Sequence, residues 1–453
     1  MYCAKCGTEC QPEFRFCKKC GAPVAVAAVS AELKEVTTAH VVETTVQTVA
    51  AVQVPIAPAT AQAAPPPPPP PGAPQAAYQQ PVYQQAVYYV SAQARTLHQM
   101  NVLQSVRSRL LSMASTESLE GFSLTAMFSE VFKRRDTAMV EDYILVGTSK
   151  STPPIELVET GWPKPWLFFR LLAALIIAYV GLTFLFMRTG NTNCVPGMMF
   201  LGAFAVPLAT LVLFFELNTP RNVSVHVVAK LFLMGAVASL AVALLGYALP
   251  IFNISTMEAG IVEECAKLLA VVIIMRGVRY KYILNGILFG ATVGAGFAAF
   301  ETAGYALNEG LLQGLLPSLQ QGVNQTHAMH AGVTAMLHLL LLRGVEAPLG
   351  HVAWTALSAG AFWRVKQDKP TSVAMLFNPS FLKAFAIPVV MHAVWDAPWQ
   401  LPFSGNQILT GLITWYVVFG LVQQGLRQVK AEQKLHLEST LAHVEAQLQP
   451  VAV

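Results

Sequence analysis

The sequence predicts an all-α polytopic membrane protein, and three observations support this fold class. Of its 453 residues, 54% are hydrophobic and only 12% are charged, about half of the ~25% charged residues usual in soluble domains. The mean hydropathy is +0.49. Apolar runs long enough to cross ~30 Å of hydrocarbon as helices recur through the second half of the chain. We expect about eight transmembrane helices, with nine as an alternative, preceded by a small zinc ribbon and a disordered linker.

Residues 1–24 predict the zinc ribbon. Two CxxC pairs lie close together, and four thiolates suit tetrahedral zinc. Paired CxxC motifs in a chain with no visible signal peptide favour a metal site in a reducing compartment over disulfides, although a redox dithiol pair is an alternative. The expected ligands of this structural zinc are Cys3, Cys6, Cys17 and Cys20.

The predicted ribbon resembles the small zinc-ribbon modules found at the ends of many prokaryotic membrane proteins. The resemblance covers about twenty residues and implies zinc binding without naming a partner. Its basic cluster is modest, so we expect a cytosolic protein partner rather than nucleic acid. The basic residues are Lys5, Arg15, Lys18 and Lys19.

Two segments separate the ribbon from the first apolar run. Residues 25–95 are rich in Ala, Pro and Gln and cannot bury a core, so we expect a disordered linker. Residues 96–160 are more balanced, with apolar residues at helical spacing between 97 and 111 and a second piece at 123–141. We expect a cytosolic amphipathic helical segment, either a small hairpin or a surface that contacts lipid.

Eight segments predict membrane spans within a domain at 161–427, which is followed by a cytosolic tail at 428–453. The expected spans are 166–187, 197–217, 226–249, 257–275, 282–307, 347–364, 381–400 and 406–425.

The apolar segment 328–342 decides between eight and nine spans. Apolar segments of roughly 10–14 residues are more often re-entrant or interfacial than spanning. If this segment does not cross and the N-terminus is cytoplasmic, the basic residues after the fourth and sixth spans all lie inside, as the positive-inside rule requires. Those residues are Arg276, Arg279, Lys281, Arg364, Lys366 and Lys369. We therefore predict eight spans and a cytoplasmic N-terminus, in an inner or plasma membrane of prokaryotic type.

The fourth predicted span carries three ionisable residues, Glu263, Glu264 and Lys267. Insertion scales assign about 2.5–3.5 kcal/mol to each such group at the centre of a span, so these groups usually face a bundle interior or a wet cavity. Glu263 and Lys267 are four residues apart and share a helix face, whereas Glu264 points about 100° away. Taken alone, this pair favours a structural role as an ion pair between helices.

Three further motifs place ionisable groups inside later spans. An FxxxE motif ends at Glu301 in a glycine-rich run, whose small residues would let this helix pack closely against the fourth span. His351 begins an HxxxT motif, and His392 and Asp396 form an HxxxD motif, so each helix presents two polar residues on one face. Four such motifs together predict one hydrated cavity inside the bundle.

Such a cavity would contain the groups that peptide hydrolysis needs. A carboxylate near cations can act as a general base on water, and imidazoles can stabilise an oxyanion or transfer a proton. The alternative is a non-enzymatic membrane scaffold or a proton-coupled transporter that uses the same groups as a relay. Internal repeats would favour a transporter, and the two halves of the domain show none.

In combination, the motifs resemble the PrsW-type intramembrane proteases, which are similar in plan to the CAAX-prenyl and bacteriocin-immunity proteases. The resemblance covers residues 160–425 and rests on EExxK, FxxxE, a helix with Arg, Pro and His, and HxxxD, in this order. The CAAX relatives have His and Asn where this chain has Glu301 and Asp396, which fits the PrsW branch. The resemblance implies cleavage of membrane-anchored proteins such as anti-sigma factors.

The resemblance also implies roles for single residues. Glu263 would be the base that activates water, with Glu264 and Lys267 supporting it. The expected catalytic residues are Glu263, Glu264, Lys267, Glu301, His351, His392 and Asp396. The family has been described both as metalloproteases and as glutamic proteases. Because the chain has no HExxH motif, we expect a metal-independent glutamate mechanism, with a catalytic metal as the alternative.

Overall fold

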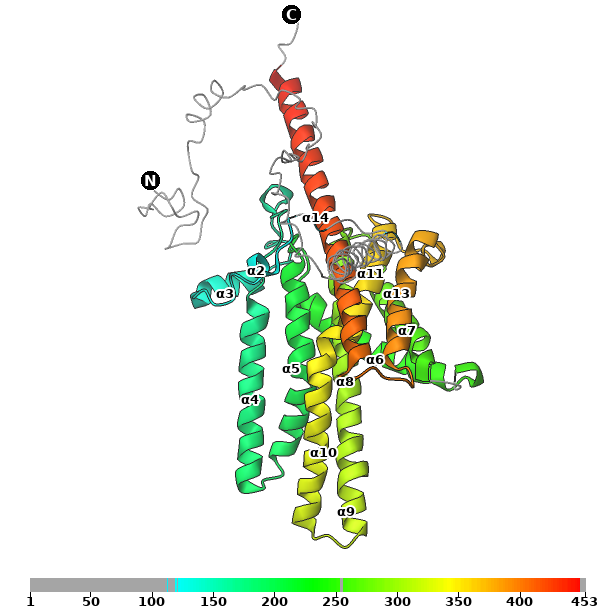
Figure 1. Cartoon of the computed structure of the whole chain (residues 1–453). Helices are drawn as coiled ribbons and strands as arrows, with labels where there is room; N and C mark the ends of the chain where they lie inside the picture. Colours follow the sequence, from blue (N-terminus) through cyan, green and yellow to red (C-terminus); the bar gives the residue numbers. More distant parts are fainter. Residues whose placement is uncertain (1–111, 113–118, 120, 253–255, 449–453) are drawn as a thin grey trace, which may run out of the picture. The chain divides into compact units, whose positions relative to one another are not determined.

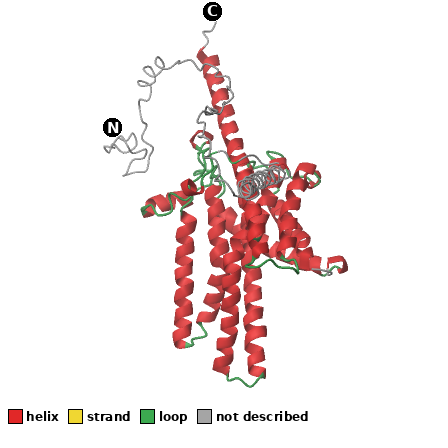
Figure 2. Cartoon of the chain, in the orientation of Figure 1, coloured by secondary structure: helices red, strands yellow, loops and turns green. Residues whose placement is uncertain are grey.

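The computed structural model describes residues 112, 119, 121–252 and 256–448. The predicted zinc ribbon with its four expected zinc ligands, the linker at 25–95 and most of residues 96–120 lie outside these ranges. Within them every regular element is helical and no strand occurs (Figure 2), which confirms the all-α prediction for this part of the chain.

Nine helices of 16 residues or more form the membrane domain in the described residues (Figure 1). They are α4 (Leu167–Thr189), α5 (Cys194–Leu217), α6 (Val225–Tyr247), α7 (Ala259–Ile274), α8 (Ile283–Asn308), α10 (Gln325–Glu346), α11 (His351–Lys366), α13 (Pro379–Trp395) and α14 (Gly405–Leu448). Each of the eight predicted spans coincides with one of these helices, and α10 is the ninth. The shorter elements are α2 (Leu124–Met127), α3 (Thr137–Ile144), α9 (Leu316–Gln320), α12 (Val373–Leu376), a π-helical turn at Glu309–Leu315 and 3₁₀ turns at Ile155–Leu157, Pro250–Phe252, Thr256–Glu258 and Ala347–Leu349.

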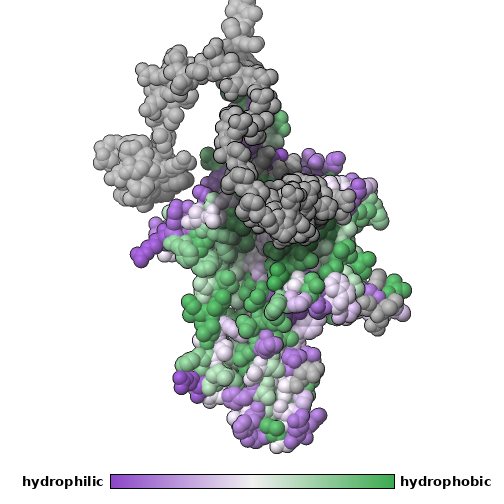
Figure 3. All heavy atoms as spheres, viewed as in Figure 1, coloured by the Kyte–Doolittle hydropathy of each residue, from purple (hydrophilic) through white to green (hydrophobic). Residues whose placement is uncertain are grey.

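Six segments of the described chain are long and apolar enough to cross a membrane on their own. α10 and α11 together form one of these segments, Gln325–Lys366, and Figure 1 shows α11 continuing from the upper end of α10. The segment 328–342 is therefore part of a longer helical run, which its short apolar stretch did not indicate. Asn324 begins this run by accepting a hydrogen bond from the backbone N–H of His327. Figure 3 shows hydrophobic residues over the middle of the visible face and hydrophilic ones towards its lower end.

The chain segments before α4 and at the end of α14 meet at the same end of the helix bundle. Gln433 Nε2 donates hydrogen bonds to the carbonyl oxygens of Ile155 and Glu156, both at 3.0 Å. Arg279, in the connection between α7 and α8, reaches the carbonyl oxygen of Gly147 at 3.4 Å. The described part of the chain therefore enters and leaves the helix bundle at the same end.

The segment that precedes α4 packs on the N-terminal end of that helix. α2 and α3 are two short helices in place of the single predicted piece at 123–141. The rings of Phe128 and Phe168 lie 5.8 Å apart, and those of Phe132 and Phe169 lie 5.4 Å apart. This segment is therefore anchored by aromatic contacts to the start of the membrane domain.

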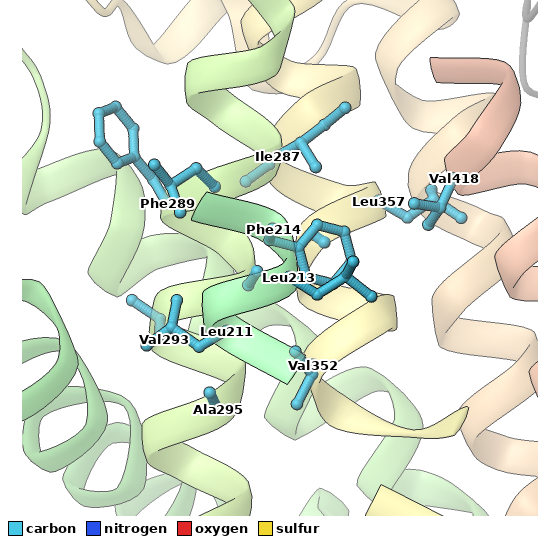
Figure 4. Packing of buried hydrophobic residues seen from close by; sticks show 14 of the residues in the cluster. Leu211, Leu213, Phe214, Ile287, Phe289, Val293, Ala295, Val352, Leu357 and Val418 are labelled. Atoms are coloured by element: carbon cyan, nitrogen blue, oxygen red, sulfur yellow. The ribbon is translucent and has the colours of Figure 1, made fainter. Parts of the chain in front are cut away.

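Small residues bring α8 into close contact with α11. A Cβ on Gly290 would lie 2.1 Å from the carbonyl oxygen of Thr355, so only glycine fits there. Figure 4 shows the surrounding core, with Phe289 and Val293 on α8, Val352 and Leu357 on α11, and Leu213 and Phe214 on α5. The glycine-rich run packs most closely against α11, and Phe297 within it also contacts Val262 and Ala266 of α7, as expected. This packing positions residues of the three helices around one site.

Candidate active site

A cavity of about 560 Å³ lies among α6, α7, α8, α10, α11 and α13. Five of the seven predicted catalytic residues line it, namely Glu263, Glu301, His351, His392 and Asp396. The other two, Glu264 and Lys267, lie behind this lining with fully buried side chains. The structure thus brings all four sequence motifs together.

Glu263 is the carboxylate at the centre of this arrangement. Its Oε1 accepts a hydrogen bond from the hydroxyl of Tyr247 at 2.8 Å. Its Oε2 lies 3.7 Å from Lys267 Nζ, 3.8 Å from His392 Nε2 and 3.9 Å from His351 Nδ1. Oε2 is buried and has no hydrogen-bond partner among the described residues. A buried carboxylate oxygen without a partner is costly, so this atom marks the position where a reacting group or an ion would be bound.

Lys267 connects the ionisable residues of α7 with those of α11. Its Nζ lies 2.6 Å from Glu264 Oε1 and 2.9 Å from His351 Nδ1. The ammonium also lies 4.6 Å from the centroid of the Phe297 ring, which is a cation–π contact. One buried lysine therefore pairs with carboxylates of its own helix and contacts an imidazole on another helix.

His392 is held on three sides. Its Nδ1 lies 3.0 Å from Glu264 Oε1, its Nε2 lies 3.2 Å from Asp396 Oδ2, and the Trp354 ring stacks on it at 4.4 Å between centroids. Nδ1–H can donate to Glu264, while Nε2 faces both Asp396 and the cavity. Glu264 thus fixes the orientation of this imidazole.

His351 is held by a second carboxylate. Glu301 Oε2 lies 3.0 Å from His351 Nε2 and accepts a hydrogen bond from Arg343 Nη2 at 2.6 Å. Arg343 Nε also donates to the hydroxyl of Thr302 at 2.9 Å. Glu301 was expected to meet α7, whereas its partners lie on α10 and α11. With Nε2–H bound to Glu301, the lone pair of Nδ1 faces Lys267 and Glu263.

The donor atoms of Glu263, His351 and His392 fit a divalent metal such as zinc. All three lie within 4.8 Å of one another, and imidazole nitrogens with a carboxylate oxygen are typical zinc ligands. Each imidazole is bound through its other nitrogen to a carboxylate, an arrangement common behind metal-binding histidines. His327, His330 and His338 belong to no such group within the described residues.

Three contacts in the site have no counterpart in the sequence motifs. Tyr247, at the end of α6, binds Glu263, and Trp354 stacks on His392. Arg343 was noted only as part of the helix before His351, and its bond to Glu301 depends on how α10 packs beside α8. An aromatic residue at the end of a span is typical of the membrane interface, so its position alone did not indicate a site residue.

An all-helical membrane domain with carboxylates, a lysine and imidazoles around one cavity is the arrangement expected of a membrane-embedded enzyme. Residues 197–422 match the family described as PrsW family intramembrane metalloprotease. The membrane domain of this chain belongs to the PrsW family, and the protein is an integral membrane protein and an intramembrane protease. The matched range includes all seven predicted catalytic residues. No curated protein and no solved structure matches the chain.

Proposed function

We propose that the protein hydrolyses peptide bonds of membrane-anchored proteins in the cavity around Glu263. The observation that carries this proposal is Glu263 Oε2, a buried oxygen without a hydrogen-bond partner among the described residues, with three nitrogen atoms within 4 Å. A carboxylate in such surroundings can take a proton from water, and the cavity of about 560 Å³ leaves room for an unwound stretch of substrate.

In this proposal Glu263 Oε2 accepts a proton from water as its oxygen attacks the scissile carbonyl carbon. The same proton then passes to the nitrogen of the leaving amine as the peptide bond breaks. The Lys267 ammonium and, when both of its ring nitrogens carry a proton, the imidazolium of His392 stabilise the negative charge that develops on the carbonyl oxygen. Glu264 positions His392 and Lys267 without lining the cavity itself.

Glu301 and Asp396 act through the imidazoles in the same scheme. Glu301, held by Arg343, fixes the ring of His351, and Asp396 lies 3.2 Å from His392 Nε2. Both carboxylates line the cavity, where they can also exchange protons with water.

A catalytic metal is compatible with this site. Glu263, His351 and His392 would hold it, and a bound divalent ion would lower the pKa of water and polarise the scissile carbonyl. Asp396 would then be the cavity carboxylate that lies next to these three metal ligands. The matched family is described as a metalloprotease. Together with the donor atoms of Glu263, His351 and His392, this description supports the metal-dependent alternative more strongly than the sequence alone did.

The remaining assignments concern orientation and the N-terminal module. We propose that the end of the bundle that carries residues 121–160 and the end of α14 is cytoplasmic, because Arg276, Arg279 and Lys281 lie in the connection there. Cys3, Cys6, Cys17 and Cys20 would bind a structural zinc. The resulting ribbon would recruit a cytosolic protein partner.

Co-expression with single-span proteins that carry a reporter on each side of the membrane tests the proposed reaction. Wild-type protein should release a fragment from one or more of them. Glu263→Gln removes the proton acceptor with little change in shape, so cleavage should disappear while the protein still inserts and folds. Lys133→Gln, far from the cavity, serves as the control. An active Glu263→Gln protein would contradict the proposal.

A further inference from the structure

A second cavity of about 370 Å³ adjoins the active site between α6 and α8. We call it the α6–α8 groove. Its outer part is lined by Leu244 of α6 and by Gly304 and Tyr305 of α8. All three are exposed, and Leu244 is 68% exposed. Because α6 is a helix of membrane-spanning length, an exposed leucine on it faces lipid, and the groove therefore opens sideways into the bilayer.

The groove is continuous with the catalytic cavity. Tyr247, Glu263, Glu301 and Tyr305 line both spaces. A chain that lies in the groove would therefore reach Glu263 without passing through an aqueous phase.

The two helices that border the groove touch at one level and separate at another. A Cβ on Gly296 of α8 would lie 2.6 Å from the carbonyl oxygen of Phe232 of α6, so the backbones are in contact there. Two turns further along α8, a Cβ on Gly304 would meet no atom of the described residues within 4 Å. The missing side chain at Gly304 thus leaves space at the point where the helices diverge.

We propose that the α6–α8 groove is the lateral opening through which a transmembrane segment of the substrate reaches Glu263, and that Gly304 keeps it open. This inference rests on the proposed proteolysis and names its route. The occupant is an apolar chain segment because the outer lining is apolar. At the inner end, the carboxylates and the hydroxyl of Tyr247 can bind the backbone groups that an unwound segment exposes and cannot leave unpaired in lipid.

Gly304→Leu tests the route because Gly304 lines the groove and a Cβ there meets no atom of the described residues within 4 Å, so the added side chain would occupy the groove. Gly181→Leu is the matched control, since Gly181 lies on α4 and also has no atom of the described residues within 4 Å of a Cβ. Full-length protein in proteoliposomes would be given a single-span reporter with a Leu/Ala-rich transmembrane segment.

Gly304→Leu should cleave the single-span reporter ~10-fold or more slowly than wild type while its unfolding temperature stays at the wild-type value. Gly181→Leu should cleave the reporter at the wild-type rate. Cleavage of the reporter by Gly304→Leu at the wild-type rate would overturn the inference.

A photo-crosslinking experiment tests the entry route independently of peptide cleavage, and it does not require the Gly304→Leu variant to fold. Both proteins carry Glu263→Gln. In one of them a photoreactive benzoylphenylalanine replaces Leu244, and in the control it replaces Ile177 of α4, which is 72% exposed. The probe is a biotinylated Leu/Ala transmembrane peptide of about 21 residues.

The peptide should be captured several-fold more at position 244 than at position 177. Equal capture, or labelling of phospholipid alone, would overturn the inference. Cleavage by the wild-type protein together with equal capture would contradict the route and leave the reaction intact. Preferential capture with no cleavage by the wild-type protein would contradict the reaction and leave the groove as a helix-binding site.

Discussion

Lys267 Nζ and Glu264 Oε1 lie 2.6 Å apart within α7, and neither side chain is exposed to solvent. Lys133 and Glu130 form an ion pair of the same length and also three residues apart, but the Lys133 side chain is 65% exposed. An exposed pair exchanges its contact for water at little cost, whereas a buried charge depends on its partner. The two pairs therefore separate the effect of burial from that of geometry.

Lys267→Met should destabilise the protein strongly because it leaves Glu264 buried without its main counter-charge. Breaking one side of a buried pair costs about 3–5 kcal/mol, so we expect a clear fall in the midpoint of thermal unfolding in detergent. Lys133→Met should cause only a small change. Adding Glu264→Gln to Lys267→Met should recover part of the loss. Equal effects of the two lysine substitutions would contradict this assignment.

The sequence was sufficient to predict the helices and the members of the site, and insufficient to predict their partners. Charged residues in apolar helices must face one another or a cavity, so Glu263, His351 and His392 could be grouped from their motifs alone. The bond between Glu301 and Arg343 depends on the packing of α8 against α10 and α11, which periodicity does not specify. The same holds for Tyr247, whose hydroxyl meets Glu263 only through the tertiary fold.

Metal removal should distinguish the two mechanisms. If Glu263, His351 and His392 hold a catalytic ion, purified full-length protein should contain one more equivalent of metal than the His351→Ala or His392→Ala variant. A chelator should abolish cleavage, and adding zinc should restore it. Metal is measured by mass spectrometry.

Cys6→Ser/Cys20→Ser serves as the control for metal bound by the N-terminal cysteines. This variant should lose the structural equivalent and keep the catalytic one. Equal metal content in wild type and both histidine variants, together with chelator-resistant cleavage, would instead support the metal-independent glutamate mechanism.

Gly290→Ala should destabilise the contact between α8 and α11. The added Cβ would lie 2.1 Å from the carbonyl oxygen of Thr355, and overpacking of this kind costs about 1–3 kcal/mol. Gly181→Ala adds the same atom where no described residue is in the way, and alanine favours a helix over glycine by up to ~1 kcal/mol. The unfolding midpoint should therefore fall in the first variant and stay level or rise in the second. A tolerated Gly290→Ala would show that the two helices are further apart than described.

Glu216 joins the start of α4 to the end of α5, as a helix-end charge outside the active site. Its carboxylate accepts hydrogen bonds from the backbone N–H groups of Trp166 at 2.7 Å and of Leu167 and Phe168 at 2.9 Å. These donors have no partner within α4, and a negative charge is favourable at a helix N-terminus. Glu216→Gln removes the charge and turns an N–H₂ group towards donors, so we expect a loss of about 1.5–3 kcal/mol in unfolding free energy.

Tyr143→Phe is the matched control for Glu216→Gln, and it adds a pH dependence. Tyr143 donates one hydrogen bond to Glu216 Oε1 at 3.1 Å, so the removal of this bond should cost less, about 0.5–1.5 kcal/mol.

Burial and the neighbouring Glu216 carboxylate raise the pKa of Tyr143 above its ordinary value. The folded protein therefore keeps the phenol proton at pH values where the unfolded chain has lost it. This contribution to stability is complete below about pH 10 and is lost as the pH rises further. Unfolding curves at pH 8 to pH 11 should fall more steeply for wild type than for Tyr143→Phe, and parallel curves would contradict the buried position of this hydroxyl.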